Sequence, residues 1–417
     1  MLHEILRQAW MSLRRQPLRS CLTMAGIVWG VVAVTMLLAY GSGFRGVLMY
    51  TFNSVGQDLI FCWPGTTGEQ AGGERAGKLV KFEQADIDDL RAQATFAKTI
   101  CPETVKVLSI SHAERSMDTA IRGVCKEYGE IRNEIPTDGR WLNEDDEINH
   151  RRVVFIGARV RKKLFSQMPS VGETVDINGV RFTVIGTMDR KFQGMTYFRT
   201  DDDSAWIPYS TAADMWDAKS ASVIVVEPVA PGFEGKTQQQ VLAILADRQH
   251  FSPTDKRAIV MIGMAQFRPL YVAICYGLEI LLLFVGLLTL GIGGIGVMNI
   301  MLVTVNERTR EVGLRRALGA RRHHIRMQFL AEALALTLAG GVVGALISVL
   351  LGAFIGTLPF LGPAYEDTSG KVDIHMQVSW EILAASTIVL VIVGVLSGLM
   401  PAMRAARMDP VEALRYE

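Results

Sequence analysis

The segment Asn306-Glu-Arg-Thr-Arg-Glu-Val-Gly-Leu-Arg-Arg-Ala-Leu-Gly-Ala320 places a dense set of charges between two long apolar stretches near the C-terminus. Charge held between two membrane spans must lie at one face of the bilayer, and this much arginine indicates the cytoplasmic face. Its apolar residues recur at roughly helical spacing, and they are Val305, Val312, Leu314 and Leu318. This pattern predicts a short amphipathic helix along the membrane surface, which would suit a handle on which a cytoplasmic partner pulls.

The distribution of apolar residues, more than their 49% share, indicates a membrane protein. Four blocks are long enough to cross a bilayer, which takes about 20 residues. The predicted spans are 20–41, 271–304, 327–357 and 380–402. The region 42–270 has ordinary globular composition and is long enough for a core of its own. A formal net charge of +1 gives no argument for a nucleic-acid partner.

Arginine near the spans predicts the orientation, because cytoplasmic loops carry an excess of basic residues. Basic residues precede the first span, fill the 305–326 loop and follow the last span, whereas the 358–379 loop is acidic. We therefore expect both ends, 1–19 and 403–417, to be cytoplasmic, with 42–270 outside. The apolar face of residues 2–15 predicts an interfacial helix. A long basic start and a long apolar run favour an uncleaved anchor over a signal peptide.

The external region reads as an α+β domain. Strand-like runs occur at 58–63, 105–111, 119–124 and 222–227, helix signals at 82–94 and 234–249, and a strand feeding a helix at 153–166. Residues 174–185 alternate around Asn178-Gly179, the strongest hairpin signal in the chain. We expect two lobes, one from 55–139 with 216–268 and an inserted β-rich lobe from 140–215. The fold class is thus an α-helical membrane protein with four spans (1+3) and a large two-lobed α+β extracytoplasmic domain.

Five cysteines are present, and three of them, Cys62, Cys101 and Cys125, fall in the external region. One disulfide among these three is compatible with an oxidising compartment and would leave an odd thiol, but the spacing does not decide whether a bridge forms. Cys21 and Cys275 lie in or beside spans and read as buried apolar thiols.

Small residues recur at every fourth position in the last two spans. They are Gly340, Gly344, Ser348, Gly352 and Gly356 in the third span, and Gly394 and Gly398 in the fourth. Such rows let helix backbones approach closely, so we expect these faces to pack against other spans or a second copy.

Several motifs resemble known binding sites but lack the neighbouring residues or the location that such sites need. Gly72–Lys78 approaches a P-loop, but Leu79 replaces the Ser or Thr that holds magnesium, and a flexible loop is expected. Gly291–Gly296 matches GxGxxG inside an apolar span, which favours helix packing. The acidic runs Glu144–Glu147 and Asp201–Asp203 read as solvated turns, and His323-His324 sits beside arginines that would repel a metal. No catalytic residue, metal site or cofactor is predicted in this chain.

Ionisable residues are scarce within the spans. Glu279 lies at the external end of the second span, and Asn299 lies near its cytoplasmic end. Ion or proton pathways usually need ionisable groups at mid-membrane. We therefore expect the chain to be powered by another protein.

The sequence resembles the MacB/FtsX superfamily of ABC-transporter permeases. The resemblance is close in Gly293–Leu302 and Glu307–Arg322, recurs in Pro401–Glu417, and extends to Leu18–Ile27 and to the β segment Gly172–Gly186. It implies four spans in a 1+3 layout, a periplasmic domain with a porter-like and an inserted lobe, and a homodimer. It also implies a separate ABC ATPase that binds ATP and Mg, since MacB itself carries a fused ATPase domain.

By matching position, the resemblance assigns eight residues to ATPase coupling: Glu307, Arg308, Arg310, Glu311, Gly313, Arg315, Arg316 and Gly319. Gly313 would allow close approach of the ATPase, and Gly319 would end the helix. The alternative is that the arginines only anchor the loop to anionic membrane lipids and set topology. The interleaved glutamates favour docking.

The function implied is a non-enzymatic permease subunit of the inner membrane. It would transmit ATP-driven motion to its periplasmic domains (mechanotransmission) and export an amphiphile, peptide or antibiotic-like cargo. A periplasmic adaptor and an outer-membrane channel would be further partners. Two alternatives stay open: lipoprotein extraction of the LolC/LolE kind, and an FtsX-like regulator of a periplasmic hydrolase or sensor that transports nothing.

Overall fold

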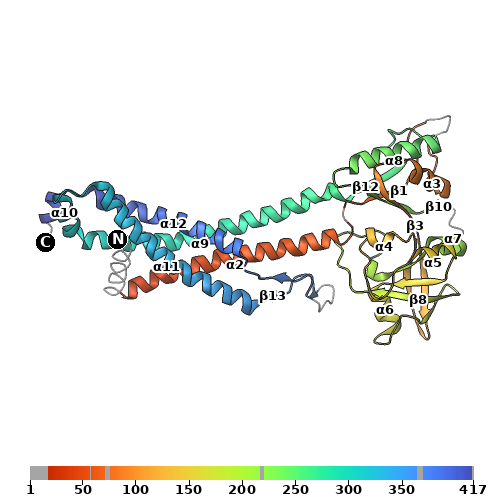
Figure 1. Cartoon of the computed structure of the whole chain (residues 1–417), viewed down its shortest axis with the longest axis horizontal. Coiled ribbons are helices and arrows are strands. Elements are labelled where there is room, and N and C mark those ends of the chain that lie inside the picture. The colour runs from red at the N-terminus through yellow and green to blue at the C-terminus, as the bar shows by residue number, and fades with distance from the viewer. Residues whose placement is uncertain (1–16, 57, 71–75, 217–219, 364–369, 416–417) are drawn as a thin grey trace. The chain divides into compact units, whose positions relative to one another are not determined.

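The computed structural model describes residues 17–56, 58–70, 76–216, 220–363 and 370–415 of the chain (Figure 1). They belong to two compact units, which we call the helical unit, up to Val47 and from Ala273 onward, and the mixed unit, Leu48–Val272. The predicted interfacial helix at 2–15 lies outside the described residues.

Among the described residues, four helices are long and apolar enough to cross a membrane. They are α2 (Pro17–Asn53), α9 (Arg268–Glu307), α11 (Arg322–Ile355) and α12 (Trp380–Arg407). Two short helices, α10 (Thr309–Ala317) and α13 (Pro410–Arg415), follow α9 and α12. Between α11 and α12, the strands β13 (Thr357–Leu358) and β14 (Ile374–His375) pair in antiparallel fashion.

The long helices extend beyond the predicted spans. Helix α2 continues to Asn53 rather than ending near residue 41, and α12 continues to Arg407. Helix α11 begins at Arg322, so its first turn takes up the end of the predicted 305–326 loop. Hydropathy marks only the apolar part of a helix, whereas backbone hydrogen bonding continues into polar sequence.

Helices α2 and α9 meet at backbone contact. A Cβ added at Gly293 would lie 2.8 Å from the carbonyl oxygen of Gly26, and one at Gly30 would lie 2.9 Å from the Cα of Leu290. Gly293 belongs to the GxGxxG run, which therefore serves helix packing in α9. Close approach of backbones is how membrane helices gain contact energy.

Most of the predicted small-residue positions also lie at helix contacts. Added Cβ atoms would meet Ile27 from Gly340, Val31 from Gly344, the Met376 carbonyl from Gly352, Thr337 from Gly394 and Ala333 from Gly398. Ser348 is buried and donates to the Gly344 carbonyl at 2.7 Å. Gly356 differs: it has φ +63°, follows the last residue of α11 and has open space beside it. In this chain Gly356 ends a helix instead of packing against one.

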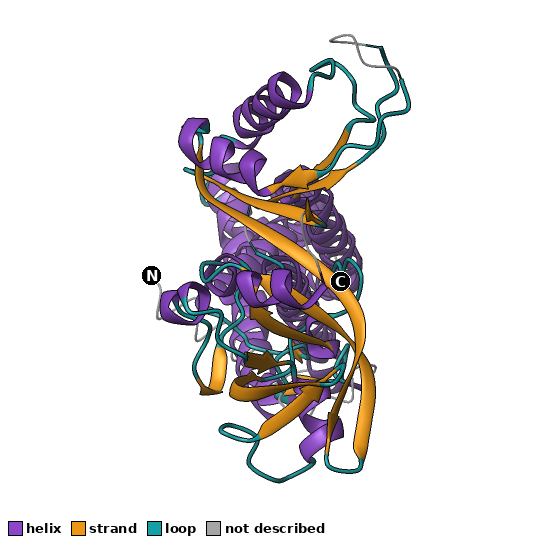
Figure 2. Cartoon of the chain, turned by 90° about the vertical axis from the view of Figure 1, so that its right-hand side faces the viewer, coloured by secondary structure: helices purple, strands orange, loops and turns teal. Residues whose placement is uncertain are grey.

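In the mixed unit, ten strands of the described residues form one sheet (Figure 2). Their spatial order is β12-β1-β11-β3-β4-β9-β6-β8-β5, with β7 pairing with β3 and β8. The strands are β1 (Ile60–Pro64), β3 (Ala97–His112), β4 (Arg115–Val124), β5 (Pro136–Gly139), β6 (Val153–Ile156), β7 (Thr174–Ile177), β8 (Val180–Met188), β9 (Ser204–Pro208), β11 (Val223–Pro228) and β12 (Ile259–Gly263). A separate short pair joins β2 (Phe82–Glu83) to β10 (Ser220–Ala221).

Helices cover this sheet in two groups. Helices α3 (Gln84–Gln93) and α8 (Glu234–Gln249) lie side by side and share a core with β1 and β11 (Figure 1). Helices α6 (Ala158–Phe165) and α7 (Tyr209–Trp216) contribute to a second core with β4, β6, β7, β8 and β9. The remaining helical turns are α4 (Tyr128–Ile131), α5 (Glu144–Ile148), η1 (Asp201–Asp203) and η2 (Met264–Phe267).

Local sequence signals locate several of these elements. The hairpin of β7 and β8 turns at Asn178 (φ 48°) and Gly179 (φ 84°), as the Asn-Gly pair predicts. Helix α8 spans Glu234–Gln249, the bounds that the sequence predicts. The lobe boundary near residue 140 differs, because β5 pairs with β8 and so belongs with the inserted half. Each half has a core of its own, but a third core, which includes Phe61 and Val225 of one half and Phe155 and Trp206 of the other, spans both, and the halves share one continuous sheet.

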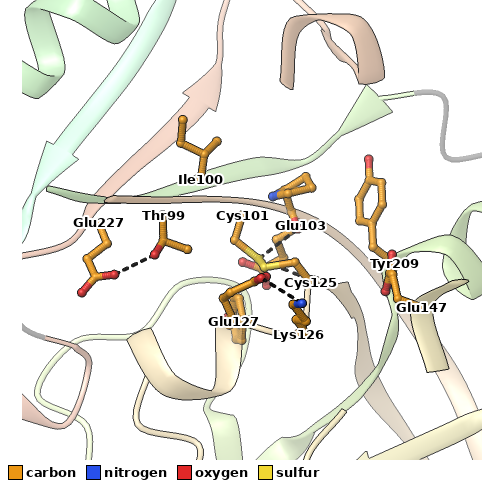
Figure 3. The surroundings of a disulfide bond; sticks show 12 residues. Thr99, Ile100, Cys101, Glu103, Cys125, Lys126, Glu127, Glu147, Tyr209 and Glu227 are labelled. Carbon is orange, nitrogen blue, oxygen red and sulfur yellow. Dashed lines mark hydrogen bonds and ion pairs between the residues drawn. A yellow bond between two sulfur atoms is a disulfide. The ribbon is translucent and has the colours of Figure 1, made fainter. Parts of the chain in front are cut away.

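A disulfide joins Cys101 on β3 to Cys125, just after β4 (Figure 3). Lys126 and Glu127 form an ion pair beside it. Cys62 and Cys275 are buried free thiols. The bridge that the sequence left undecided is thus present, and Cys62 is the unbridged cysteine of the external three.

The solvated turn predicted for the acidic run Glu144–Glu147 is wrong, because the run lies in helix α5 and Asp146 is fully buried. Arg140 donates to both oxygens of Asp146, at 2.5 and 2.9 Å. Glu147 accepts from the backbone N–H groups of Tyr209 and Ser210 at the start of α7. Of the P-loop look-alike, residues 71–75 lie outside the described residues, and Leu79 forms an isolated bridge with Thr66.

Candidate functional site

The charged segment folds as a short helix tied closely to its neighbours. Helix α9 ends at Glu307, Arg308 occupies the break, and α10 begins at Thr309. After Ala317 the chain reaches Gly319 with φ +94°, a conformation that favours glycine and ends the helix. Arg321 then occupies the extended position directly before the first residue of α11.

The single apolar face predicted for this segment is wrong. Val305 and Val312 are buried, but Leu314 is 53% exposed and Leu318 is 81% exposed. At about 100° per residue, Leu314 and Leu318 lie on the side of the helix opposite Val312. The segment therefore has two apolar faces, one turned into the helical unit and one turned outward.

Five exposed residues share the outward side, which we call the docking face: Glu307, Arg310, Glu311, Leu314 and Leu318. The four that follow the break, Arg310, Glu311, Leu314 and Leu318, fall within a sector of about 100° at the helical spacing, and Glu307 is the last residue of α9. Charges of both signs flank the two leucines. An exposed apolar patch rimmed by charge is typical of a protein–protein contact.

The opposite side, which we call the anchoring face, contacts the rest of the helical unit. Arg308 Nη1 pairs with Glu332 Oε2 at 3.2 Å, and Arg315 Nη1 donates to Gln328 Oε1 at 2.7 Å, both on α11.

Two further contacts reach the last helices. Arg316 Nη1 donates to the carbonyl of Ala406 on α12 at 2.8 Å. A Cβ added at Gly313 would lie 2.6 Å from the Cβ of Ala413 on α13. In this chain the absence of a side chain at Gly313 thus lets α13 pack closely against α10. The resemblance had instead assigned Gly313 to close approach of an ATPase. The eight residues assigned to ATPase coupling accordingly divide: three lie on the docking face, four on the anchoring face, and Gly319 ends the helix.

Glu332 was missed by the sequence reasoning, which named only Glu279 and Asn299 as polar residues in the spans. It lies ten residues into α11 and is 3% exposed, between the buried Phe329 and Ala333. The signal was available in the sequence. An acid ten residues inside an apolar helix needs a cation as its partner. The sequence places arginines in the charged segment that directly follows the preceding span.

The mixed unit holds a second set of buried charges, which we call the ionic cluster: Glu103, Arg122, Arg132, Glu134, Lys191 and Asp201. Arg122 Nη1 pairs with Glu103 Oε1 at 2.6 Å, and Arg132 Nη2 pairs with Asp201 Oδ2 at 3.1 Å. Lys191 Nζ lies 2.8 Å from both Glu134 Oε1 and Asp201 Oδ2. The solvated turn predicted for Asp201–Asp203 is therefore wrong, since Asp201 is fully buried.

Burial and neighbouring charges shift the acids of this cluster in opposite directions. Burial would raise the pKa of Asp201, but Lys191, Arg132 and Arg122 outweigh it and hold that pKa well below its ordinary value. Burial, joined by the Asp201 carboxylate, raises the pKa of Glu134 to about 8. Burial also raises the pKa of Asp202 to about 6. In the described residues, no group of three or more His, Cys, Asp and Glu is placed to hold a metal ion.

Two protein-family models match the chain. A MacB-like periplasmic core domain matches residues 20–244, and an FtsX-like permease C-terminal domain matches residues 283–410. The first model alone covers more than half of the chain.

Curated relatives match along nearly the whole sequence. The macrolide export ATP-binding/permease protein MacB of Bdellovibrio bacteriovorus is 30% identical over 416 residues, covering 99% of this chain and 62% of that protein. The MacB protein of Chlorobaculum tepidum is 31% identical, covering 98% of this chain and 61% of that protein. This chain thus spans about three fifths of the length of these relatives.

Among solved structures, the periplasmic region of MacB from Actinobacillus actinomycetemcomitans aligns with a TM-score of 0.42 and 17% identity, covering 54% of this chain and 96% of that chain. Four membrane-length helices, a large α/β domain and the two matching family models agree. The chain belongs to the MacB-like family of ABC transporter permeases, and it is an inner-membrane protein with a periplasmic domain.

Proposed function

We propose that this chain is the permease component of an ABC-type efflux system, with both termini cytoplasmic. A partner ATPase docks on the docking face of α10, and its ATP-driven motion passes through the helices to the periplasmic domain. That domain then exports an amphiphile, a peptide or an antibiotic-like cargo. The relatives named for macrolide export support the export assignment.

The observation that carries this proposal is the division of α10 into two faces. The anchoring face fixes α10 to α11, α12 and α13, so that a load on the helix reaches three neighbours at once. The docking face offers Leu314 and Leu318 to a groove, with Glu307, Arg310 and Glu311 around them. Charges at the rim of such a contact set orientation and specificity.

The proposal includes further partners. A homodimer would bring two periplasmic domains and two α10 helices together, and a periplasmic adaptor and an outer-membrane channel would carry the cargo onward. Lipoprotein extraction and hydrolase regulation share the docking step. They differ in the periplasmic protein that co-purifies with the complex, a lipoprotein acceptor in one case and a hydrolase in the other.

Purification of the full chain from native membranes tests the docking step. We expect an ABC ATPase to co-purify with the wild type and to be lost with Glu311→Arg, which reverses a charge on the docking face. The variant should still fold, because Glu311 gives up only an exposed pair with Arg315 at 2.6 Å. Arg407→Glu, at the exposed end of α12, is the control and should retain the ATPase. An intact complex with Glu311→Arg would refute the docking assignment.

A further inference from the structure

Arg308 and Glu332 form an ion pair at the point where the charged segment leaves α9. Arg308 occupies the single-residue break between α9 and α10, with φ −102° and ψ 18°. Its side chain turns away from the docking face, and its Nη1 lies 3.2 Å from Glu332 Oε2. The pair joins the residue at this break to the interior of α11.

Glu332 lies in a setting that a carboxylate tolerates only when paired. Its side chain is 5% exposed, and that of Arg308 is 22% exposed. Phe329 and Ala333 on the same helix belong to the apolar core of the helical unit. Drawing a cation away from a buried carboxylate is costly, so movement of Arg308 away from Glu332 is opposed.

Helix α11 in turn holds α12 tightly. Added Cβ atoms at Gly394 and Gly398 would lie 2.7 Å from Thr337 and Ala333, one residue beyond Glu332 in the second case. Helices packed this closely move together rather than slide past each other. A displacement of Arg308 is therefore passed to α11 and α12 as a unit.

We propose that the Arg308–Glu332 pair is the positioning link that transmits motion of α10 to α11 and α12, and that Arg308 does not contact the ATPase. This inference rests on the proposed function, because the motion comes from a docked ATPase. It reverses the assignment that matching position gave to Arg308. The pair fixes the position of Arg308 relative to α11, whereas the docking face binds the ATPase.

The first arm of the test needs no ATPase. Hydrogen exchange of residues 309–317 is measured in the detergent-solubilised full chain. Glu332→Gln removes the charge of the partner at nearly constant shape, and we expect exchange in α10 to rise about tenfold. Arg308→Lys keeps the positive charge and should exchange like the wild type. Unchanged exchange in Glu332→Gln would overturn the proposal.

The second arm uses the ATPase recovered with the wild type. ATP should alter hydrogen exchange of residues 370–379, which precede α12 and pair through β14 with the strand that follows α11, in the wild type and in Arg308→Lys. In Glu332→Gln the ATPase should still co-purify, while the ATP-induced change falls about tenfold, within the usual range of coupling free energies. Arg310→Gln, on the docking face, is the matched variant and should weaken co-purification instead.

A double variant guards against misfolding. Arg308→Met with Glu332→Leu replaces the buried pair by apolar side chains, a change that usually preserves stability. It should retain the ATPase and lose the ATP-induced change. Loss of the ATPase in this variant, or a normal ATP response, would overturn the proposal. If the wild type recovers no ATPase, the proposed function fails, and the first arm still decides whether the pair holds α10.

Discussion

The interior of the helical unit and the interior of the mixed unit are stabilised by different kinds of contact. In the helical unit, glycines such as Gly293 and Gly344 bring backbones together, while large side chains such as Ile292 and Phe354 stay exposed. In the mixed unit, aromatic side chains such as Trp206 and Phe155 are buried, and the ionic cluster crosses the interior. The difference reflects the medium around each unit.

Lipid is as apolar as a helix surface, so burying leucine between membrane helices gains little, and close packing must supply the contact energy. Water makes apolar burial favourable, so the mixed unit can carry the cost of buried charge. The ionic cluster of the mixed unit is a network of three cations and three acids. In the described part of the helical unit, Arg308 pairs with the buried Glu332 at the break between α9 and α10.

The largest expected effect comes from breaking the ionic cluster. Arg122→Met keeps the side-chain volume but leaves Glu103 and Asp201 without their shared cation. Removing one partner of a buried pair usually costs about 3–5 kcal/mol. We expect the mixed unit to lose that much stability, measured by denaturant-dependent hydrogen exchange of β3 and β4 in the full chain.

The surface pair of Lys98 and Glu227 provides the control for this loss. Lys98 lies 2.9 Å from Glu227 but its side chain is 57% exposed, so Lys98→Met should change stability by less than about 1 kcal/mol. A similar loss in both variants would mean that burial of the cluster is not what makes it costly to break.

A smaller effect should appear as a dependence of stability on pH. The pKa of Glu134 is raised from 4.5 to about 8, mainly by burial. Its contribution is therefore fully present below about pH 4.5 and is lost as the pH rises through about 8. Between pH 6 and 8, folding takes up one proton at Glu134, so stability falls by at most about 1.4 kcal/mol per unit rise in pH. Denaturant unfolding of the full chain at several pH values should show this slope.

Two amide variants separate the groups responsible. Glu134→Gln should remove the slope between pH 6 and 8. Asp202→Asn, at a carboxyl whose pKa is raised to about 6, should act only at lower pH. A wild-type slope that survives in Glu134→Gln would show that another group titrates in this range.

The sequence predicts elements whose signals are local. The Asn178-Gly179 turn needs positive φ at both residues, which these types adopt readily, and the four spans follow from apolar runs. Helix α8 has the predicted bounds, and it ends in a local feature: His250 takes a left-handed conformation (φ 56°) with its N–H bonded to the Ala246 carbonyl.

What depends on distant partners was not predicted. Asp201 reads as part of a polar turn, and its burial depends on contacts with Lys191, ten residues before it, and Arg132, 69 residues before it. Likewise, the outward position of Leu314 and Leu318 depends on which side of α10 meets α11. Periodicity showed that apolar residues recur in this segment. Assigning Val305, Val312, Leu314 and Leu318 to one face ignored the angular position of each residue, which places Leu314 opposite Val312.

The smallest expected effect tests how the helical unit packs. Gly293→Ala would put a methyl group 2.8 Å from the carbonyl oxygen of Gly26, a backbone atom that moves only if α2 moves. Forcing extra volume into a close contact of this kind costs about 1–2 kcal/mol. Gly291→Ala, two residues away with open space beside it, should cost nothing. Thermal unfolding of the solubilised chain should separate the two variants, while exchange in the mixed unit stays unchanged. If they unfold alike, backbone contact between α2 and α9 is not what holds the helical unit together.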